Sequence, residues 1–563
     1  MNIELGTSLC FDDILMEPLL SSISTRKSIS LETNIATNNR KLILKTPLIG
    51  SPMDTVTETD MAIKMALNGG LGIIHRYMSI DEQVLQVTKV KRFLQYIIKE
   101  PYKIIPDTNL YDIEILRKSY NVSSFCVVDN YENNNLIGIL TNRDIEYMIH
   151  CKTYYNQEYN EHLQEHIKYL TAGNFMTQTQ KLITLDINTT NITNNNITNT
   201  TNTTNTTNTT NTTNITNTNI NTTINQNALL LLHFNLDSVL SIAKDLIHKN
   251  KIEKIPIVNG SVLIGLITLK NICHYENNKY KACIDSNGSL CVGGAIGIVD
   301  DYIERLDRLV SAGVDLICID VANGFNTNIF NTISVIRAKY PLLVLMVGNV
   351  CNWQGYAALA QYDVDCIRIG VGNGSICTTR LETGIGKGQF SAVLECFRYK
   401  NDYDNINING RQYPNIICDG GSLGKTGNKV KALACGSSAI MLGRTLASTI
   451  ESPGIIIHRN GKRFKYIRGM ASTMANLSKQ EKSSVSKETP VNKHSEGVDG
   501  EQELSGSVID VIEQINGGLK SGMSYLGCET INQLHSKSSK GEIKFNLITS
   551  IGMSENGIRV KTY

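Results

Sequence analysis

A cysteine followed by two threonines stands at the end of a glycine-rich stretch in this chain. The stretch reads GVGNGSICTTR, from Gly370 to Arg380, and it follows the apolar run DCIRIG. We therefore expect Cys377 in a loop after a strand, where Gly372 and Gly374 permit positive φ angles. A thiol on such a loop, with a hydroxyl at Thr379, suits nucleophilic attack on an electrophilic carbon. The plainer alternative is a tight turn beside a cysteine that packs as a small apolar residue.

Two further motifs offer groups that bind a phosphorylated sugar. The sequence DGGS at 419–422 supplies the carboxylate of Asp419, which can bind ribose hydroxyls, and the backbone N–H of Gly421. The sequence MLGRTLA places Gly443 and Arg444 at an expected helix start, where backbone N–H groups favour anions. Either motif alone is equally well explained as a structural turn or a solvated charge. Together with a loop thiol, they indicate a nucleoside monophosphate site.

The segments that position these groups alternate apolar runs with helical patterns. The apolar runs include DLICIDVA, LLVLMVGN, DCIRIGVG, NIICDGG and SAIMLG, whereas 299–313 and 427–436 have helical periodicity. Strands without polar alternation, separated by helices, predict a parallel sheet covered on both faces. So many units in series predict an α/β fold of the (β/α)8 TIM-barrel type, with its active site at the carboxyl ends of the strands. An open doubly wound sheet is the alternative, although no GxGxxG follows the first strand.

Residues 100–277 show a different pattern. A strand-strand-helix unit occurs twice, at 134–148 and at 260–274, which indicates an internal duplication. Between the two copies, residues 188–227 are almost wholly Asn and Thr. Such a composition buries too little apolar surface to offset its conformational entropy, so we expect this stretch to be disordered.

The duplicated region resembles a tandem pair of cystathionine-β-synthase (CBS) modules. The resemblance implies a regulatory purine nucleotide in the cleft between the copies, with Thr141 and Asp144 of GILTNRD near its ribose. The second copy has Thr268 and Asn271 at these places, so we expect its site to be weaker or lost. A module that only packs is the alternative.

Composition excludes several partner classes. The chain has 563 residues, a formal net charge of +2 and 19% charged residues, which favours neither nucleic acid nor an anionic membrane surface. No secretory signal and no apolar run of membrane-spanning length are found. The fourteen cysteines are scattered without a CxxC pair, which is typical of a reducing compartment. We therefore expect a cytoplasmic protein.

The motifs taken in order resemble one enzyme family. SPMDTVTE, GVGNGSICTTR, DGG, KALACGSSAIMLG, ESPG and RGMAS are similar to the IMP dehydrogenase/GMP reductase family, and there too a CBS pair interrupts the barrel after its second unit. The resemblance implies a barrel formed by 1–99 and 278–563, a CBS pair at 100–277, and a homotetramer or octamer. It also implies that Cys377 attacks purine C2 of GMP or IMP while a nicotinamide dinucleotide exchanges hydride at the same carbon.

The resemblance assigns roles to further residues. Thr379 and Glu496 would relay a proton near Cys377, and the carbonyls of Gly372, Gly374 and Cys377 would surround a potassium ion. The residues implied in substrate binding are Ser375, Asp419, Gly421, Gly443, Arg444, Gly469, Met470 and Ser495. Those implied in cofactor binding are Arg76, Asp320 and Asn323.

Two enzymes of the family share the covalent purine–cysteine adduct, and they differ in its fate. The dehydrogenase oxidises IMP with NAD⁺ and hydrolyses the adduct with an Arg-Tyr pair on a flap, which here corresponds to about 471–500. The sequence before Glu496-Gly497, SKQEKSSVSKETPVNKHSEG, contains neither Arg nor Tyr. The reductase instead expels ammonia from GMP and reduces the adduct with NADPH, so it needs no hydrolytic base.

Other stretches divide between the two enzymes. DVANGF at 320–325, TGIGKGQFSAVLEC at 383–396 and HSEG resemble the reductase, whereas SPMDTVTE, the CBS pair and the C-terminal tail resemble the dehydrogenase. Residues that carry the mechanism outweigh architecture, because an insertion can be gained without altering the chemistry. We therefore expect an NADPH-dependent GMP reductase. IMP dehydrogenase, and a non-catalytic nucleotide sensor, are the alternatives.

Overall fold

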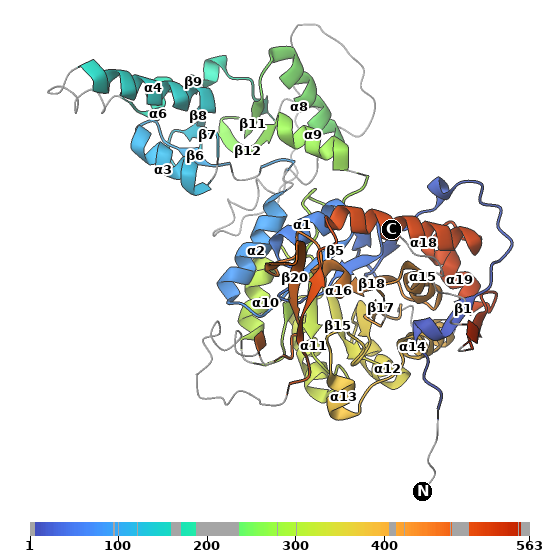
Figure 1. The fold of residues 1–563 in the computed structure, drawn as a ribbon. Helices are drawn as coiled ribbons and strands as arrows, with labels where there is room; N and C mark the ends of the chain where they lie inside the picture. The colour runs from blue at the N-terminus through green and yellow to red at the C-terminus, as the bar shows by residue number, and fades with distance from the viewer. Residues whose placement is uncertain are drawn as a thin grey trace. The chain divides into compact units, whose positions relative to one another are not determined.

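The chain forms two compact units in the computed structural model shown in Figure 1. Unit 1 combines Met1–Leu94 with Asn278–Tyr563, and unit 2 is Gln95–Asn277. The Asn/Thr-rich stretch 188–227 and most of the expected flap lie outside the described residues. The structure describes residues 6–93, 96–98, 101–120, 122–158, 170–186, 236–278, 280–299, 301–404, 412–421, 423–472, 474–475, 495–549 and 551–552.

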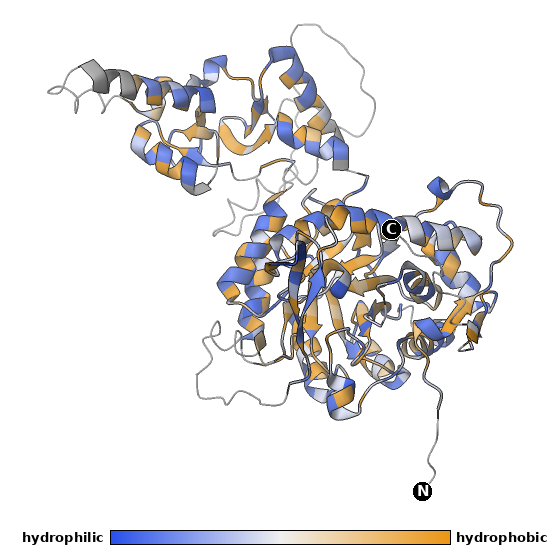
Figure 2. Cartoon of the chain, viewed as in Figure 1, coloured by the Kyte–Doolittle hydropathy of each residue, from blue (hydrophilic) through white to orange (hydrophobic). Residues whose placement is uncertain are grey.

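Eight parallel strands of unit 1 close into a barrel, which confirms the predicted (β/α)8 fold. Nearly all strand residues are buried, because the barrel interior covers one face and the surrounding helices cover the other. Figure 2 accordingly shows the strands as mainly hydrophobic. In barrel order the strands are β4 (Leu48–Gly50), β5 (Leu71–Ile74), β13 (Gly293–Ile296), β14 (Leu316–Asp320), β15 (Val344–Val350), β16 (Cys366–Ile369), β17 (Asn415–Asp419) and β18 (Ala439–Leu442), and β18 pairs back to β4.

Helices follow the barrel strands, and a few elements lie outside the repeat. The helices of unit 1 are α1 (Thr59–Leu67), α2 (Ile80–Phe93), α10 (Tyr302–Ser311), α11 (Thr327–Lys339), α12 (Trp353–Ala360), α13 (Thr379–Thr383), α14 (Gln389–Asp404), α15 (Thr426–Ala434), α16 (Arg444–Ala447), α18 (Val508–Tyr525) and α19 (Ile531–Ser539). An antiparallel sheet of β19 (Ile456–Arg459), β20 (Lys462–Arg468) and β21 (Asp499–Glu503) holds the two ends of the expected flap. Two-stranded sheets pair β1 (Ile14–Met16) with β22 (Phe545–Leu547), and β2 (Thr33–Asn34) with β3 (Ile43–Leu44).

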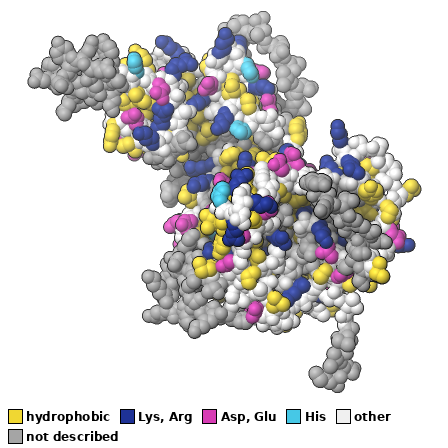
Figure 3. Space-filling view, viewed as in Figure 1, with side chains coloured by type: hydrophobic (Ala, Val, Ile, Leu, Met, Phe, Trp, Pro, Cys, Tyr) yellow, Lys and Arg dark blue, Asp and Glu magenta, His cyan; other side chains and the backbone are white. Residues whose placement is uncertain are grey.

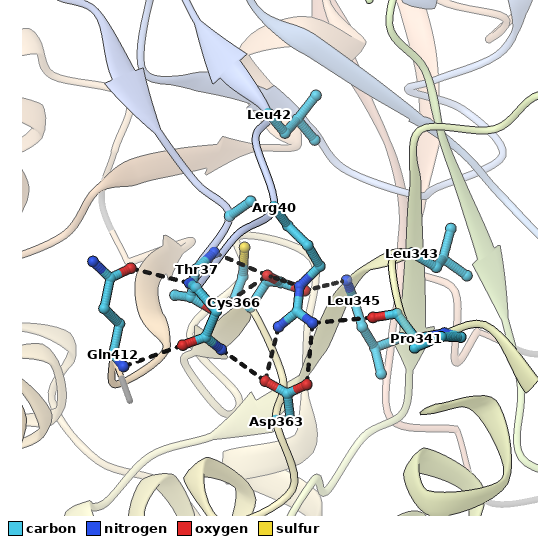
Figure 4. Close-up of polar contacts among 12 residues, drawn as sticks. Thr37, Arg40, Leu42, Pro341, Leu343, Leu345, Asp363, Cys366 and Gln412 are labelled. Carbon is cyan, nitrogen blue, oxygen red and sulfur yellow. Dashed lines mark hydrogen bonds and ion pairs between the residues drawn. The ribbon is translucent and has the colours of Figure 1, made fainter. Parts of the chain in front are cut away.

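A buried ion cluster lies at the end of the barrel opposite the predicted site (Figure 4). Asp365 directly precedes β16 and is fully buried. Figure 4 shows Arg40 beside Asp363, to which its Nη2 donates at 2.8 Å. The Asp365 carboxylate accepts from Arg40 Nε and Arg337 Nη2, both at 2.8 Å, and from the backbone N–H of Thr37 and Leu345 at 2.9 Å. Because a buried carboxylate is costly unless it is paired, we assign this cluster to holding the barrel together.

Unit 2 repeats one arrangement twice. β7 (Phe125–Val128), β8 (Leu136–Leu140) and α4 (Asn142–Glu158) form the first copy, and β11 (Lys254–Asn259), β12 (Val262–Thr268) and α9 (Leu269–Asn278) form the second. The sheets are completed by β6 (Lys103–Ile104), β9 (Thr177–Gln178) and β10 (Leu185–Asp186), and the other helices are α3 (Leu110–Tyr120), α6 (Ala172–Phe175) and α8 (Leu236–Asn250). The strand-strand-helix duplication is therefore present, and its identity as a CBS pair stays a prediction.

The two copies of unit 2 join reciprocally. Leu136 N donates to the Ser261 carbonyl and Leu263 N donates to the Asn134 carbonyl, each at 2.9 Å. Side chains of both copies also share one buried cluster, formed by Cys126, Val128, Leu136, Ile139, Val258, Leu263 and Leu266. The equivalent edges of the copies thus pack on each other.

The surface of the protein carries both signs of charge. On the face shown in Figure 3, basic and acidic side chains are mixed, in keeping with the net charge of +2. In the part of the chain that the structure describes, no helix is long and apolar enough to cross a membrane.

Candidate active site

A cavity of about 570 Å³ lies at the carboxyl ends of the barrel strands. Its wall comes from the segments that follow β4, β5, β14, β16, β17 and β18, together with residues 469–471 and 496–497. A volume of this size lies within the usual range for small-molecule sites. The thiol loop and the two phosphate motifs singled out in the sequence all line it.

Cys377 lies next to a hydroxyl and a carboxylate. The partly buried Cys377 Sγ is 3.2 Å from Thr379 Oγ1, and Thr379 Oγ1 donates to Glu496 Oε2 at 2.8 Å. Because the Thr379 proton is engaged by the carboxylate, the hydroxyl oxygen is left to accept from the thiol. The structure thus brings the three predicted catalytic residues into one hydrogen-bonded chain, although Glu496 is 117 residues from Thr379.

Backbone pairing brings Glu496 to the thiol loop. Thr378 N donates to the Glu496 carbonyl at 2.9 Å, and Val498 N donates to the Ile376 carbonyl at 3.0 Å. Gly469 lies against both segments, since a Cβ there would be 3.1 Å from the Ile376 carbonyl oxygen. The position of the carboxylate is therefore set by main-chain bonds on either side of it.

Two glycines of the thiol loop differ in backbone conformation. Gly372 has a φ of +67°, a conformation that glycine permits, whereas Gly374 does not lie in the left-handed region. At Gly374 the carbonyl accepts from Cys377 N at 3.1 Å, which closes a tight turn without a positive φ. Among the described residues, no group of three or more His, Cys, Asp or Glu side chains could hold a metal ion.

Arg368 lies in the barrel interior, and sequence reasoning did not assign it to the site. From β16, its guanidinium bonds Asp320 Oδ1 at 2.5 Å and Asp419 Oδ2 at 2.8 Å. Burial alone lowers the pKa of Arg368, but the carboxylates of Asp419 and Asp320 together raise that pKa well above its ordinary value. Arg368 therefore remains a cation. Its guanidinium pairs with both Asp419, which is predicted to bind ribose, and Asp320, which is predicted to bind the cofactor.

A second donor orients Asp419. Asn349, at the end of β15, donates from Nδ2 to Asp419 Oδ2 at 2.9 Å and to the Gly370 carbonyl at 2.8 Å. Both bonds to the carboxylate thus use Oδ2, and among the described residues Oδ1 accepts none. Asp419 lines the cavity, and its Oδ1 keeps its capacity to accept hydrogen bonds.

Seven of the eight residues assigned to substrate binding line the cavity, and Ser495 does not. Gly421 has a φ of +84°, and its N–H donates to the Asn373 carbonyl at 3.2 Å. Arg444 Nε donates to Gln502 Oε1 at 3.1 Å. Ser495 does not line the cavity, and its hydroxyl donates to the Gly497 carbonyl at 2.7 Å. The assigned residues that do line it are Ser375, Asp419, Gly421, Gly443, Arg444, Gly469 and Met470.

Two of the three residues assigned to cofactor binding line the cavity. Arg76 and Asp320 line the cavity, and the Arg76 guanidinium lies 5.4 Å from the centre of the Tyr77 ring. Tyr77 is a cavity residue that sequence reasoning missed, and burial raises its pKa, with Asp320 and Asp54 acting in the same direction and Arg76 against them. Asn323 is exposed and does not line the cavity; its Oδ1 accepts from Phe325 N at 3.1 Å.

Comparison with known proteins identifies the family of the chain. The family described as IMP dehydrogenase / GMP reductase domain matches residues 8–559. Inosine-5'-monophosphate dehydrogenase of Nitrosopumilus maritimus is 35% identical over 94% of this chain and 94% of the relative, and that of Bacillus subtilis is 33% identical over 97% and 94%.

Solved structures give a second comparison. A GMP reductase variant from Trypanosoma brucei in complex with guanosine 5'-monophosphate has a TM-score of 0.76 and 30% identity, covering 99% of both chains. The enzyme of the same organism in complex with guanosine 5'-triphosphate has a TM-score of 0.67 and 26% identity, covering 97% of this chain and 99% of that one. Because the family model spans residues 8–559 and relatives 33 to 35% identical cover almost the whole chain, this chain belongs to the IMP dehydrogenase/GMP reductase family of oxidoreductases.

Proposed function

We propose that this protein is an NADPH-dependent GMP reductase. GMP, NADPH and two protons would give IMP, NADP⁺ and an ammonium ion. The observation that carries the proposal is the Cys377–Thr379–Glu496 hydrogen-bonded chain, taken with a flap sequence that lacks the Arg-Tyr pair of the dehydrogenase. The hydrogen-bonded chain places a proton-transfer group beside a nucleophile, and the flap sequence lacks the pair with which the dehydrogenase activates water.

The first half of the reaction would replace nitrogen by sulfur at purine C2. The Cys377 thiolate adds to C2, and the bond from C2 to the exocyclic nitrogen breaks. Thr379 and Glu496 pass a proton to that nitrogen, which leaves as ammonia. The Cys377 thiol supplies a proton to the same hydroxyl, because the Thr379 oxygen accepts from sulfur.

The second half would reduce the adduct. NADPH, when bound, supplies a hydride to C2. The bond from C2 to the Cys377 sulfur then breaks with its electron pair on sulfur, so IMP leaves and the thiolate is restored. Arg76 and Asp320, on the wall next to the thiol loop, would hold the cofactor, and the exposed Asn323 would contact only a part of it outside the cavity.

Substrate contacts follow from the geometry of the wall. Asp419 Oδ1 would accept from a ribose hydroxyl, and Ser375, Gly421 and Gly443 would surround the phosphate. A potassium ion, bound by the carbonyls of Gly372, Gly374 and Cys377, would stiffen the loop, since backbone carbonyls are the ligands that this ion prefers. Unit 2 would bind a regulatory purine nucleotide, where Thr141 N and Oγ1 both donate to Asp144 Oδ2 at 2.7 Å.

IMP dehydrogenase is the second candidate. Relatives of that name are 33 to 35% identical over almost the whole chain, whereas the solved structures quoted above are GMP reductases. Overall identity includes all positions of the barrel, while the two reactions differ only in the groups around the adduct. We therefore give the flap sequence and the proton chain more weight than the identity.

One comparison of assays decides between the candidates. The purified full chain is given GMP with NADPH, and separately IMP with NAD⁺, while cofactor absorbance at 340 nm and the purine products are followed. We expect NADPH consumption with release of IMP and ammonia, and none of it in the Cys377→Ala variant. Formation of XMP from IMP would make the protein a dehydrogenase, and binding of nucleotide without turnover would favour a sensor.

A further inference from the structure

An amide side chain joins the thiol loop to the turn that carries the ribose carboxylate. Asn373 lies four residues before Cys377, and its Nδ2 donates to the Asp419 carbonyl at 2.8 Å and to Gln389 Oε1 at 2.5 Å. The Asn373 carbonyl in turn accepts from Gly421 N at 3.2 Å. Side chain and backbone of this single residue therefore both bond the loop to the turn.

Gln389 completes the connection from the opposite side. It is the first residue of α14, it is 1% exposed, and its Nε2 donates to the Ile369 carbonyl at 2.6 Å and to the Asp419 carbonyl at 3.2 Å. The Asp419 carbonyl thus accepts from both amides. The end of β16 and the end of β17 are held together by this amide pair, directly beneath the thiol loop.

Three glycines make the space that the amide pair occupies. A Cβ at Gly370 would lie 2.6 Å from Asn373 Nδ2, and one at Gly421 would lie 2.5 Å from the Gln389 Cβ. A Cβ at Gly420 would lie 3.4 Å from Asn373 Oδ1. Because the backbone packs this closely around the pair, neither the loop nor the turn can shift without breaking an amide bond.

We propose that Asn373 is a positioning residue, which sets the Cys377 loop relative to the nucleotide held at Asp419. The inference rests on the proposed function only in that a purine nucleotide binds at this site, and it applies to either reaction of the family. Asn373 acts through two other residues and is not itself a group that reacts. Loss of its amide would leave nucleotide binding largely intact while the sulfur is misplaced relative to C2.

The test uses two substitutions in the full chain at saturating potassium. Asn373→Ala removes both Nδ2 bonds, and we expect kcat to fall about 10- to 100-fold, since a misplacement near 1 Å costs this much, while KM for the nucleotide changes far less. Asn373→Asp keeps the shape but turns acceptors toward the Asp419 carbonyl and Gln389 Oε1, so its kcat should fall further. A residue needed only to fill space would give the reverse order.

Asn326 provides the matched control. It is the N-cap residue of α11, and its Oδ1 accepts from Asn328 N at 2.9 Å, a bond that Asp can also make. Asn326→Asp keeps this bond, and Asn326→Ala loses only a helix cap, which costs about 1 kcal/mol of stability; both should leave kcat unchanged. If the Asn373 variants match these controls, or if their KM rises as much as their kcat falls, the proposal is wrong.

A measurement without turnover separates this proposal from the proposed function. The rate at which iodoacetamide alkylates Cys377 is compared with and without GMP, and with and without IMP. In the wild type we expect a bound nucleotide to change that rate, and in Asn373→Ala we expect the same nucleotide affinity with a smaller change. An unaltered response in a folded Asn373→Ala variant would overturn the proposal, whichever purine reaction the wild type catalyses.

Discussion

At the scale of single residues, the site depends on polar groups that satisfy two neighbours at once. Arg368 pairs with Asp320 and with Asp419, and the Thr379 hydroxyl lies between a thiol and a carboxylate. In a buried setting each such group is stabilising only while both partners are present. Substitutions here should therefore cost more than the loss of one contact.

Removing the Arg368 guanidinium should destabilise the fold. In Arg368→Met, the carboxylates of Asp320 and Asp419 lose their shared cation, and breaking a buried pair in this way costs about 3 to 5 kcal/mol of unfolding free energy. Chemical denaturation measures the loss. Arg459→Met, which removes an exposed arginine bonded to Glu501, should change stability by less than about 1 kcal/mol. Equal effects of the two substitutions would contradict this account of Arg368.

The Thr379 hydroxyl should be needed for turnover and not for folding. Thr379→Val removes the oxygen between Cys377 and Glu496, and we expect kcat for GMP reduction to fall about 100- to 10,000-fold, the range for loss of a positioned proton-transfer group. Thr379→Ser keeps the hydroxyl and should retain most of the activity. Steady-state kinetics and thermal melting distinguish the two effects, and a Thr379→Val variant with wild-type kcat would remove Thr379 from the proton path.

At the scale of elements, the sequence predicted the frame of the site better than its connections. The barrel strands were recognisable because runs such as DLICIDVA lack polar alternation, and the thiol loop because glycines precede Cys377. The roles of Arg368, Asn349 and Asn373 depend on partners from other strands, and such pairings appear only once the barrel closes. A signal was present at Arg368, since a lone charge within an apolar buried strand requires a buried partner.

The helix α15 carries a residue that should make stability depend on pH. Lys429 lies in its first turns and is 1% exposed, and its Nζ donates only a 3.3 Å bond to the Gly424 carbonyl among the described residues. Burial lowers the pKa of Lys429 from 10.5 to about 8. The folded state therefore binds this proton less tightly than the unfolded state, and the group destabilises the fold by about 3 kcal/mol below pH 8, a penalty relieved as pH rises from 8 to 10.5.

Lys429→Met tests this effect. We expect the variant to be more stable than the wild type at pH 7, by up to about 3 kcal/mol, with the difference shrinking between pH 8 and 10.5. Lys425→Met is the control, because Lys425 is largely exposed and pairs with Asp12 at 2.9 Å, so its removal should change stability by less than about 1 kcal/mol. A stability difference that is constant with pH would show that the Lys429 ammonium is not the cause.

At the scale of the whole molecule, every residue assigned to the cavity belongs to unit 1. The chain enters and leaves unit 2 after Leu94 and before Asn278, and close to these points Lys91 Nζ bonds Asp285 at 3.0 Å and Asp315 at 2.8 Å. Contacts within unit 1 therefore hold together the two segments of unit 1 between which unit 2 is inserted. Unit 2 is expected to regulate the reaction and not to take part in it.

Replacing residues 95–277 by a glycine-serine linker should leave catalysis in place. A linker of about ten residues spans the ends with slack, at roughly 3.3 to 3.6 Å per extended residue. We expect kcat within a few-fold of the full chain, and loss of any response to purine nucleotides that do not react. An inactive but folded barrel would show that unit 2 contributes to the active site, against the proposed division of roles.

The two halves of unit 2 depend on each other through reciprocal main-chain bonds. Leu136 and Leu263 each complete the edge of the other half, and both contribute to one apolar cluster. A chain carrying a single half would expose that cluster to water and leave an open strand edge, a common starting point for aggregation. The insertion should therefore melt in one step, and descendants of this protein should keep both halves or neither.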